Sequence, residues 1–342
     1  MENTSEELSF QKKVWIKASI YALLIVLLLL IKATFNIFIL ILAGSLIAIF
    51  LRTISDFICR KTKWKEGLCL AIGFIGVFLI ASGLLLLIGA KLQSQSMELS
   101  NALPETIEKV KEVINGNEFG SKVMNKVSSS GSTKKIQELA GTFFKSTFGV
   151  FTDVYVVLFV GIFFAVSPKI YKNGLIQLIP KKGQPKGKKV LKLIAENLQK
   201  WLKGKMLSML VVSVLSAIGL AIIGVPMWLV LALIAGLFSF IPNFGPILAL
   251  IPAVLVGFME SPTTAAFVVG LYILIQIIEN NFITPLVQQK LVNIPPALIL
   301  IAQILMGSLT GGWGLLLATP IMLIVIILVQ ELYIKERDEK SA

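Results

Sequence analysis

The sequence contains no histidine and only two cysteines, Cys59 and Cys69. Without histidine there is no serine–histidine–aspartate triad, no histidine-ligated zinc and no histidine proton relay. These two cysteines cannot form a metal site or a disulfide framework. The Gly-x4-Gly-Lys-Ser/Thr phosphate loop is missing as well. We therefore expect no enzyme activity, no cofactor, no metal site and no ATP-binding module in this chain.

Charged side chains are scarce too. They make up 15% of the chain, against 56% hydrophobic residues, whereas a soluble domain has about 25% charged residues. Several apolar runs are longer than the ~18 residues that indicate a membrane span, and they are continuous rather than alternating. The sequence therefore predicts an all-α, polytopic helical membrane protein that lies in the lipid bilayer.

The net charge of +13 is concentrated in short segments beside the apolar runs. Between Lys169 and Lys205 there are eleven lysines and one acidic residue, Glu196. Positive charge next to membrane spans marks the cytoplasmic side, which explains the excess more simply than nucleic-acid binding does. We expect this segment and both termini to be cytoplasmic, and no nucleic-acid partner.

Composition divides the chain into segments of different character. They are a cytoplasmic tail (1–17), three N-terminal spans (18–90), an extracytoplasmic helical insert (91–147), a fourth span (148–166), a basic cytoplasmic amphipathic segment (167–205), a C-terminal membrane core with broken helices (206–332) and a cytoplasmic tail (333–342). One helix over both Ala18–Ile31 and Phe35–Leu51 would be about 50 Å long, too long for a ~30 Å hydrocarbon core. We therefore predict a hairpin turn near Lys32–Asn36, and about eight membrane segments in all, including broken or re-entrant helices.

An apolar run near the middle of the C-terminal core is interrupted by two prolines. The interruption reads Ile241-Pro242-Asn243-Phe244-Gly245-Pro246. Pro242 and Pro246 each remove a helical hydrogen bond, and Asn243 and Gly245 tolerate left-handed backbone. One helix should end near Ile241 and another should begin near Pro246. In a membrane such freed backbone must be buried in protein or line a wet cavity, so the break predicts a substrate or ion site. The alternative is a short polar turn at the membrane surface.

A second break is expected in the last apolar run, where glycines follow one another between residues 307 and 314. We place its helix breaks at Gly311 and Gly314, and Gln303, just before them, could line the same path. Glycines can also serve only to pack helices closely. The two breaks look loosely alike, because Gly245 precedes Pro252 as Gly314 precedes Pro320.

Polar residues form a stripe on the span that follows the first break. Gln276, Asn280 and Thr284 are spaced i, i+4, i+8 on one helix face, and Glu279 lies three residues after Gln276. A carboxylate at the centre of a span costs about 2.5–3.5 kcal/mol, so it usually faces a cavity or a partner. Such a stripe can bind a polar solute, a cation or a proton. Alternatively, Glu279 lies at the membrane edge and pairs with a basic residue such as Lys290 as an anchor.

These motifs resemble the autoinducer-2 exporter-like family of bacterial membrane proteins. The features that carry the resemblance are Ile241 to Pro246, Gln276 to Asn281 with Pro285, Pro295-Pro296, Gly307, Gly311, Gly314 and Pro320. The upstream order of three spans, an external insert, a fourth span and a lysine-rich helix is also similar. The resemblance implies a homo-oligomeric transporter of the bacterial inner membrane. It implies either export of a solute such as the furanone autoinducer-2 or sodium/proton antiport.

Our leading hypothesis is a secondary transporter or exporter-like permease for a small polar solute. Its path would be lined by Asn243, Gly245, Gln276, Glu279, Asn280, Thr284 and Gln303. One alternative is a sodium/proton antiporter in which Glu279, with Asp153, carries the cation or proton. The other is a non-transporting membrane scaffold whose insert recruits a partner.

Overall fold

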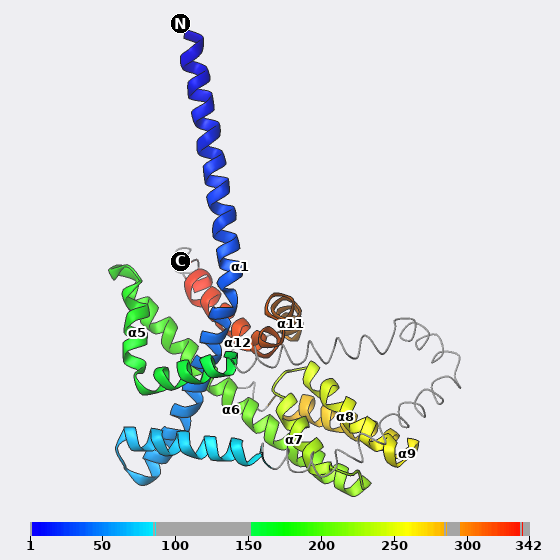
Figure 1. The fold of residues 1–342 in the computed structure, drawn as a ribbon. Coiled ribbons are helices and arrows are strands. Elements are labelled where there is room, and N and C mark those ends of the chain that lie inside the picture. The colour runs from blue at the N-terminus through cyan, green and yellow to red at the C-terminus, as the bar shows by residue number, and fades with distance from the viewer. Residues whose placement is uncertain are drawn as a thin grey trace, which may run out of the picture.

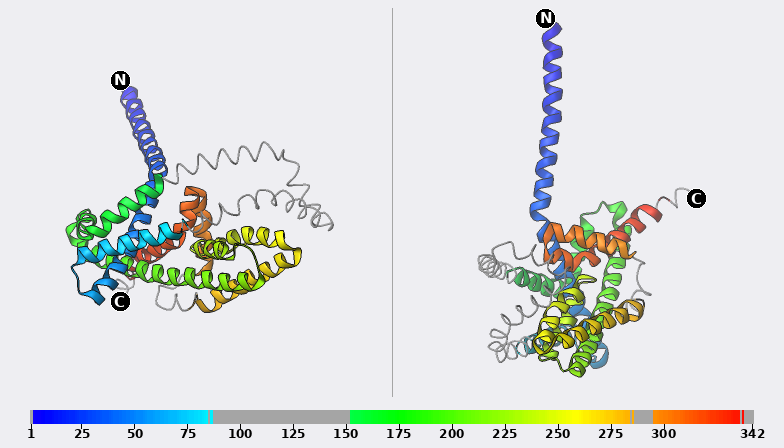
Figure 2. Two further views of the ribbon diagram at one scale, coloured as in Figure 1. Left: turned by 60° about the horizontal axis from the view of Figure 1, so that its bottom comes forward. Right: turned by 90° about the vertical axis from the view of Figure 1, so that its right-hand side faces the viewer.

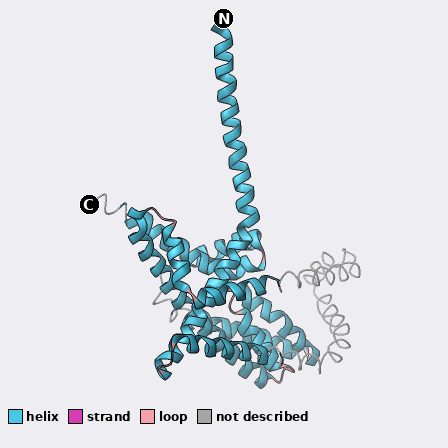
Figure 3. Cartoon of the chain, turned by 60° about the vertical axis from the view of Figure 1, so that its left-hand side comes forward, coloured by secondary structure: helices cyan, strands magenta, loops and turns pink. Residues whose placement is uncertain are grey.

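The structure is a computed structural model, and it describes residues 2–84, 86, 152–283, 285, 295–335 and 337. The expected extracytoplasmic insert (91–147) and Thr284 lie outside the described residues. Across the described ranges the secondary structure is helical, without a strand (Figure 3). The helices are α1 (Glu2–Thr62), α5 (Pro168–Gln177), η1 (Lys181–Gly183), α6 (Gln184–Ile223), α7 (Trp228–Phe238), α8 (Phe244–Glu260), α9 (Pro262–Ile278), η2 (Glu279–Ile283), α11 (Pro296–Thr310), α12 (Gly312–Val329) and η3 (Gln330–Ile334), with two more over Glu66–Leu84 and Thr152–Val166.

Five of the described helical stretches are long and apolar enough to cross a membrane. They are Thr34–Thr62, Glu66–Leu84, Lys181–Ile223, Pro262–Ile283 and Gly312–Ile334. A sixth results if Thr152–Val166 and α5, which meet at 91°, are one broken span. Helices α7, α8 and α11 are apolar but shorter. This set confirms the prediction of a polytopic helical membrane protein.

The hairpin turn predicted at Lys32–Asn36 is wrong. Helix α1 runs without interruption for 61 residues, about 90 Å at 1.5 Å per residue. The stretch Lys-Ala-Thr-Phe-Asn contains neither glycine nor proline, so nothing in its backbone chemistry ends the helix there. The N-terminal half of α1 projects from the body of the molecule, and its apolar side chains, such as Leu23 and Leu29, are exposed (Figure 1).

Helix α6 joins two segments that we had separated at residue 205. It is continuous over 40 residues, about 60 Å, because its only residue of low helix propensity between 202 and 206 is Gly204. Its first half carries the lysines and its second half is apolar. At the basic end, Lys189 Nζ lies 3.6 Å from a carboxylate oxygen of Glu331 in η3, so the residues that follow α12 lie beside the start of α6.

The helices pack around two main apolar clusters. One lies between the second half of α6 and the group α7, α8 and α9, and includes Leu220, Ala253 and Val268. The other joins the middle of α1, the first half of α6 and α12, and includes Leu198 and Leu323. Helix α6 therefore connects both halves of the molecule, as the views in Figure 1 and Figure 2 show.

Helices α7 and α8 form one broken hairpin, and α11 and α12 form a second. The first break lies close to the expected place, with both helix ends slightly earlier: α7 ends at Phe238 rather than near Ile241, and α8 begins at Phe244 rather than near Pro246. A Cβ atom at Gly245 would lie 1.8 Å from the carbonyl oxygen of Phe238, and one at Gly314 would lie 1.9 Å from that of Met306. In each hairpin, a glycine at the start of the second helix therefore allows close backbone contact with the first.

A disulfide joins Cys59 and Cys69 across the turn between α1 and the helix Glu66–Leu84. Lys63 begins this turn with left-handed backbone (φ 57°). Beside it, the Arg52 guanidinium donates a hydrogen bond of 2.8 Å to Glu66. We had expected no disulfide framework from two cysteines, and the structure joins these two in one local bond.

Candidate functional site

Glu279 is buried at the point where α9 changes from α-helix to π-helix. Helix α9 ends at Ile278, and the π-helical turn η2 starts with Glu279 itself. Only 6% of Glu279 is exposed. Single π-helical turns occur mostly inside α-helices and often at functional sites, because they shift the direction of the side chains that follow. A buried carboxylate at the start of such a turn is therefore a candidate functional residue.

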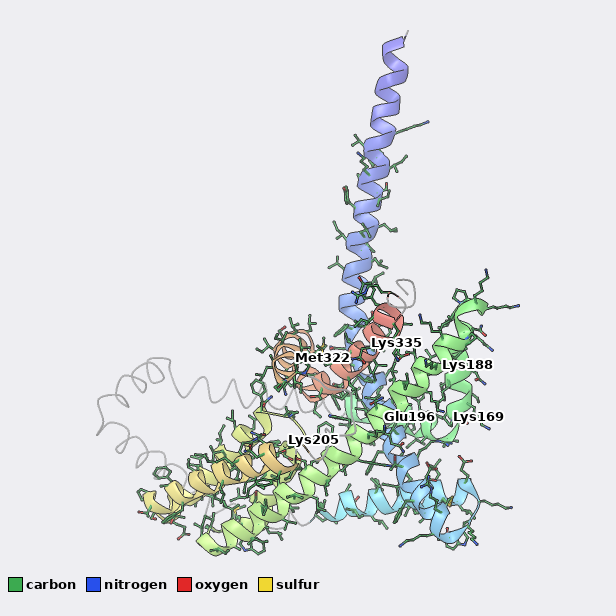
Figure 4. The ribbon with its side chains drawn as sticks, turned by 180° about the vertical axis from the view of Figure 1, so that it is seen from behind. Lys169, Lys188, Glu196, Lys205, Met322 and Lys335 are labelled. Atoms are coloured by element: carbon green, nitrogen blue, oxygen red, sulfur yellow. A yellow bond between two sulfur atoms is a disulfide. The ribbon has the colours of Figure 1, made fainter. Side chains whose placement is uncertain are left out.

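Two side chains of α6 contact the Glu279 carboxylate. The Ser208 hydroxyl donates a hydrogen bond of 2.5 Å to Oε1, and Lys205 Nζ lies 3.5 Å from the same oxygen. The Lys205 side chain is only 12% exposed. Figure 4 shows Lys205 on the stretch of α6 that passes the α7–α9 group, away from Lys188 and Lys169. The expected basic partner is thus Lys205, whereas Lys290 lies outside the described residues.

A small pocket of about 10 Å³ opens beside Glu279, between α6, α7, α8 and α9. Its polar lining comes from Ser216, Tyr272, Gln276 and Glu279. The hydroxyls of Ser216 and Tyr272 are buried and have no hydrogen-bond partner among the residues described. Buried polar groups are nearly always hydrogen-bonded, and an unpaired one costs about 1–3 kcal/mol. The residues around the pocket therefore carry two hydroxyls, an amide and a carboxylate, beside apolar side chains such as Val212 and Ala249.

The remaining residues of the predicted stripe are placed differently. Gln276 donates a hydrogen bond of 3.0 Å from Nε2 to Oδ1 of Asn280, so the i, i+4 pair forms across the start of the π-helical turn. Asn280 is exposed and does not line the pocket. Gln276 uses one of its two amide N–H groups on Asn280, so its second N–H and its carbonyl oxygen are not used by this bond.

The first break is held by the second hairpin. Gln303 of α11 is fully buried; its Nε2 donates to the Pro242 carbonyl at 2.6 Å, and its Oε1 accepts from Asn243 Nδ2 at 3.2 Å. Asn243 has positive φ (65°) and is exposed, whereas Gly245 is buried. The structure brings Gln303 and the break together, but of the break only Pro246 reaches the Glu279 pocket.

Asp153 belongs to a different contact. Its Oδ2 accepts a hydrogen bond of 2.8 Å from the indole N–H of Trp313, next to Gly314 in the second break. Glu279 is bonded instead to Ser208 and Lys205 of α6. The two carboxylates are therefore held by different elements, and Asp153 links the helix Thr152–Val166 to the start of α12.

Sequence reasoning missed Lys205, Ser208, Ser216 and Tyr272. A signal for them is present, because residues 205, 208 and 216 lie at i, i+3 and i+11 on one face of α6. Likewise Tyr272 precedes Gln276 and Glu279 at i, i+4 and i+7 on one face of α9. Two polar stripes on apolar helices indicate that these faces meet, although only tertiary structure shows that they meet each other.

The chain is similar in sequence to bacterial proteins that are named for transport. The chain is 28% identical over 271 residues to YueF, a candidate transport protein of Bacillus subtilis (strain 168), and this alignment covers 73% of each protein. It is 29% identical over 152 residues to the candidate transport protein YrrI of the same organism, covering 44% of this chain and 43% of YrrI. It is 22% identical over 175 residues to the candidate permease PerM of Escherichia coli (strain K12), covering half of each. The family model described as AI-2E family transporter matches residues 21–334, so this membrane protein belongs to the AI-2E transporter family.

Proposed function

We propose that the protein is a secondary transporter or exporter-like permease that moves a small polar solute, of the kind of autoinducer-2, across the bacterial inner membrane. We place its binding site at the Glu279 pocket. In this proposal both termini are cytoplasmic, the protein works as a homo-oligomer, and the α7–α8 and α11–α12 hairpins are the parts that move.

The observation that carries the proposal is the set of polar groups gathered inside an apolar helix bundle. Ser216 and Tyr272 line the pocket beside Glu279, and each carries a buried hydroxyl that has no hydrogen-bond partner among the described residues. A guest that hydrogen-bonds to both hydroxyls would offset about 1–3 kcal/mol for each of them. Polar residues inside a membrane protein typically mark solute or ion paths. The free-energy cost of the two unpaired hydroxyls is therefore explained if they bind a passing solute.

The size of the pocket supports a transport cycle with moving hairpins. A volume of about 10 Å³ holds roughly one water-sized group. A solute with several heavy atoms enters only if a wall moves outward. Pro246 and Ala249 of α8 form one wall, and α8 begins at the helix break. Rocking of the α7–α8 hairpin against α6 and α9 would open the pocket, in keeping with alternating access in other transporters.

The test is solute flux in proteoliposomes. We would load autoinducer-2, compare the wild type with Tyr272→Phe and Ser216→Ala, and use Glu260→Gln as the control, because Glu260 is exposed at the end of α8. Both pocket variants remove a hydroxyl without removing the charge pair, so they should fold and lose most of the flux. Flux equal to the wild type in both variants would remove this pocket from the path.

A sodium/proton antiporter is the second candidate, and one observation favours it. The hydroxyls of Ser216 and Tyr272, the Gln276 carbonyl and the Glu279 carboxylate are all oxygen donors, which hard cations prefer. This function predicts sodium flux driven by a pH gradient, which a solute exporter need not show. Glu279→Gln should abolish that flux. Asp153→Asn should leave it unchanged, because Asp153 is bound to Trp313 instead.

A further inference from the structure

A second and larger cleft lies far from Glu279, where the helix Glu66–Leu84 begins and the helix Thr152–Val166 ends. Its volume is about 600 Å³. Leu70, Phe74 and Ile162 contribute apolar walls, and Arg52, Glu66 and Lys169 contribute polar groups. In Figure 4, Lys169 lies on α5, well separated from Lys205. The cleft is therefore distinct from the pocket assigned to transport.

The polar side of the cleft has an orderly arrangement of charges. Arg52 Nε donates to the Ala165 carbonyl at 2.8 Å, and Nη1 donates to Glu66 Oε1 at 2.8 Å. These two bonds fix the guanidinium, which has five N–H donors, and leave others for a ligand. Lys169 is exposed and has no ion-pair partner within the described part of the chain. Glu66 is neutralised by Arg52, so the cleft offers an excess of positive charge.

The position of these charges matches the surface of a membrane. The candidate membrane helix Glu66–Leu84 begins at the cleft, and the apolar helix Thr152–Val166 ends there, after which the chain bends by 91° into α5. The apolar walls formed by Leu70, Phe74 and Ile162 extend along those two helices. The cleft thus has a cationic end where these two helices meet and an apolar end along their sides.

We infer that this cleft binds an anionic phospholipid. The phosphate would lie between Arg52 and Lys169, and an acyl chain would lie against Phe74 and Ile162. Charge complementarity is the argument, because basic pockets between membrane helices bind anionic headgroups and arginine forms strong hydrogen bonds with phosphate. A zwitterionic lipid has no net negative charge, so the positive charge of the cleft favours an anionic lipid over it. This inference does not depend on the transported solute.

The experiment measures lipid binding to the purified full-length protein by native mass spectrometry and by thermal shift. The probes are micelles containing phosphatidylglycerol, the same micelles with phosphatidylcholine, and inorganic phosphate alone. We expect phosphatidylglycerol to be retained and to raise the unfolding temperature, and the other two to have little effect. Binding of phosphate alone to the same degree would show that the headgroup anion suffices and would overturn the assignment to a lipid.

Three variants locate the site. Lys169→Gln should weaken phosphatidylglycerol binding about fivefold, the effect of one basic residue near an anionic membrane surface. Lys172→Gln makes the same charge change on α5 outside the cleft and should have no effect. Ala71→Trp fills the apolar part of the cleft and keeps every charge, so it should weaken phosphatidylglycerol binding while the Arg52 bonds to Ala165 and Glu66 stay intact.

Three results would overturn the proposal. The first is equal retention of phosphatidylcholine and phosphatidylglycerol, which would mean that the cleft holds bulk lipid. The second is unchanged phosphatidylglycerol binding in both Lys169→Gln and Ala71→Trp. The third is a cross-link from a cysteine introduced at Ala71 to a second copy of the chain, which would show that another subunit covers the cleft.

Discussion

Gln303 on α11 holds the carbonyl of Pro242 in the other broken hairpin, with 2.6 Å between Nε2 and the oxygen. The same amide accepts a hydrogen bond from Asn243, so one buried side chain satisfies two groups of the break. Because irregular backbone in a membrane protein needs such partners, this contact couples the two hairpins. Movement of one relative to the other requires that the Gln303 bonds stretch or break.

Replacing Gln303 by Leu should therefore lower the free energy of unfolding. The side chain keeps a similar size but loses two hydrogen bonds, each worth about 1 kcal/mol net. The measurement is the thermal unfolding midpoint of the protein in detergent. Ser308→Ala is the control, since Ser308 lies on the same helix but is exposed. If Gln303→Leu and Ser308→Ala had the same unfolding midpoint, the hydrogen bonds of Gln303 would not contribute to stability.

Gly245→Ala and Gly314→Ala should each disrupt a hairpin. A methyl group at either position would overlap a backbone carbonyl oxygen, at 1.8 Å and 1.9 Å respectively. Neither oxygen belongs to a flexible side chain, so the two helices must separate. We expect destabilisation of more than about 3 kcal/mol, at the severe end of single substitutions, read as loss of folded protein in size-exclusion profiles.

Gly270→Ala is the matched control for the glycine variants. It lies inside α9, and nothing lies within 4 Å of an added Cβ atom. Exchange of an interior helical glycine for alanine favours the helix by about 0.8–1 kcal/mol. Equal behaviour of Gly270→Ala and Gly245→Ala would contradict the proposed close contact.

Removing either member of the Glu279–Lys205 pair should destabilise the protein more than removing both. Glu279→Gln leaves a nearly buried ammonium, and Lys205→Met leaves a buried carboxylate, each at a cost of about 3–5 kcal/mol. The double variant avoids the isolated charge and should recover much of this loss. A double-mutant cycle on the unfolding free energy measures the coupling. Additive effects would mean that the two charges do not interact.

Asp153→Asn should be close to the wild type, whereas Asp153→Ala should not. The asparagine carbonyl can still accept the bond from the Trp313 indole, but alanine cannot, at a cost of about 1–3 kcal/mol if the indole N–H stays buried. Thermal unfolding together with flux distinguishes the possible roles. Loss of flux in a stable Asp153→Asn protein would show that the charge itself is needed.

The site residues that could be identified from the sequence are those whose chemistry acts locally. Pro242, Asn243 and Gly245 break a helix through their own backbone properties, so the break could be located from the sequence. Gln276 and Glu279 were identified because polar groups are costly in an apolar helix. The roles of these residues in transport are still predictions.

What could not be predicted depends on contacts between distant parts of the chain. Ser208 lies 71 residues from Glu279, and only packing of α6 against α9 joins them. Lys205 was assigned to a cytoplasmic segment because of the lysines around it, although its own side chain is nearly buried. The turn predicted near Lys32 was wrong for another reason. It was predicted from the length of the apolar run, but a helix continues where no residue breaks it.

The bond between Cys59 and Cys69 has a practical consequence, because the chain has no other cysteine. In sealed vesicles of oxidised protein, a reductant that does not cross membranes can open this bond only from the compartment that the turn faces. A thiol-reactive dye added from that same compartment would then label the turn, whose lysines and arginines predict the inner face. The protein thus carries a native reporter of its own sidedness, and no engineered thiol is required.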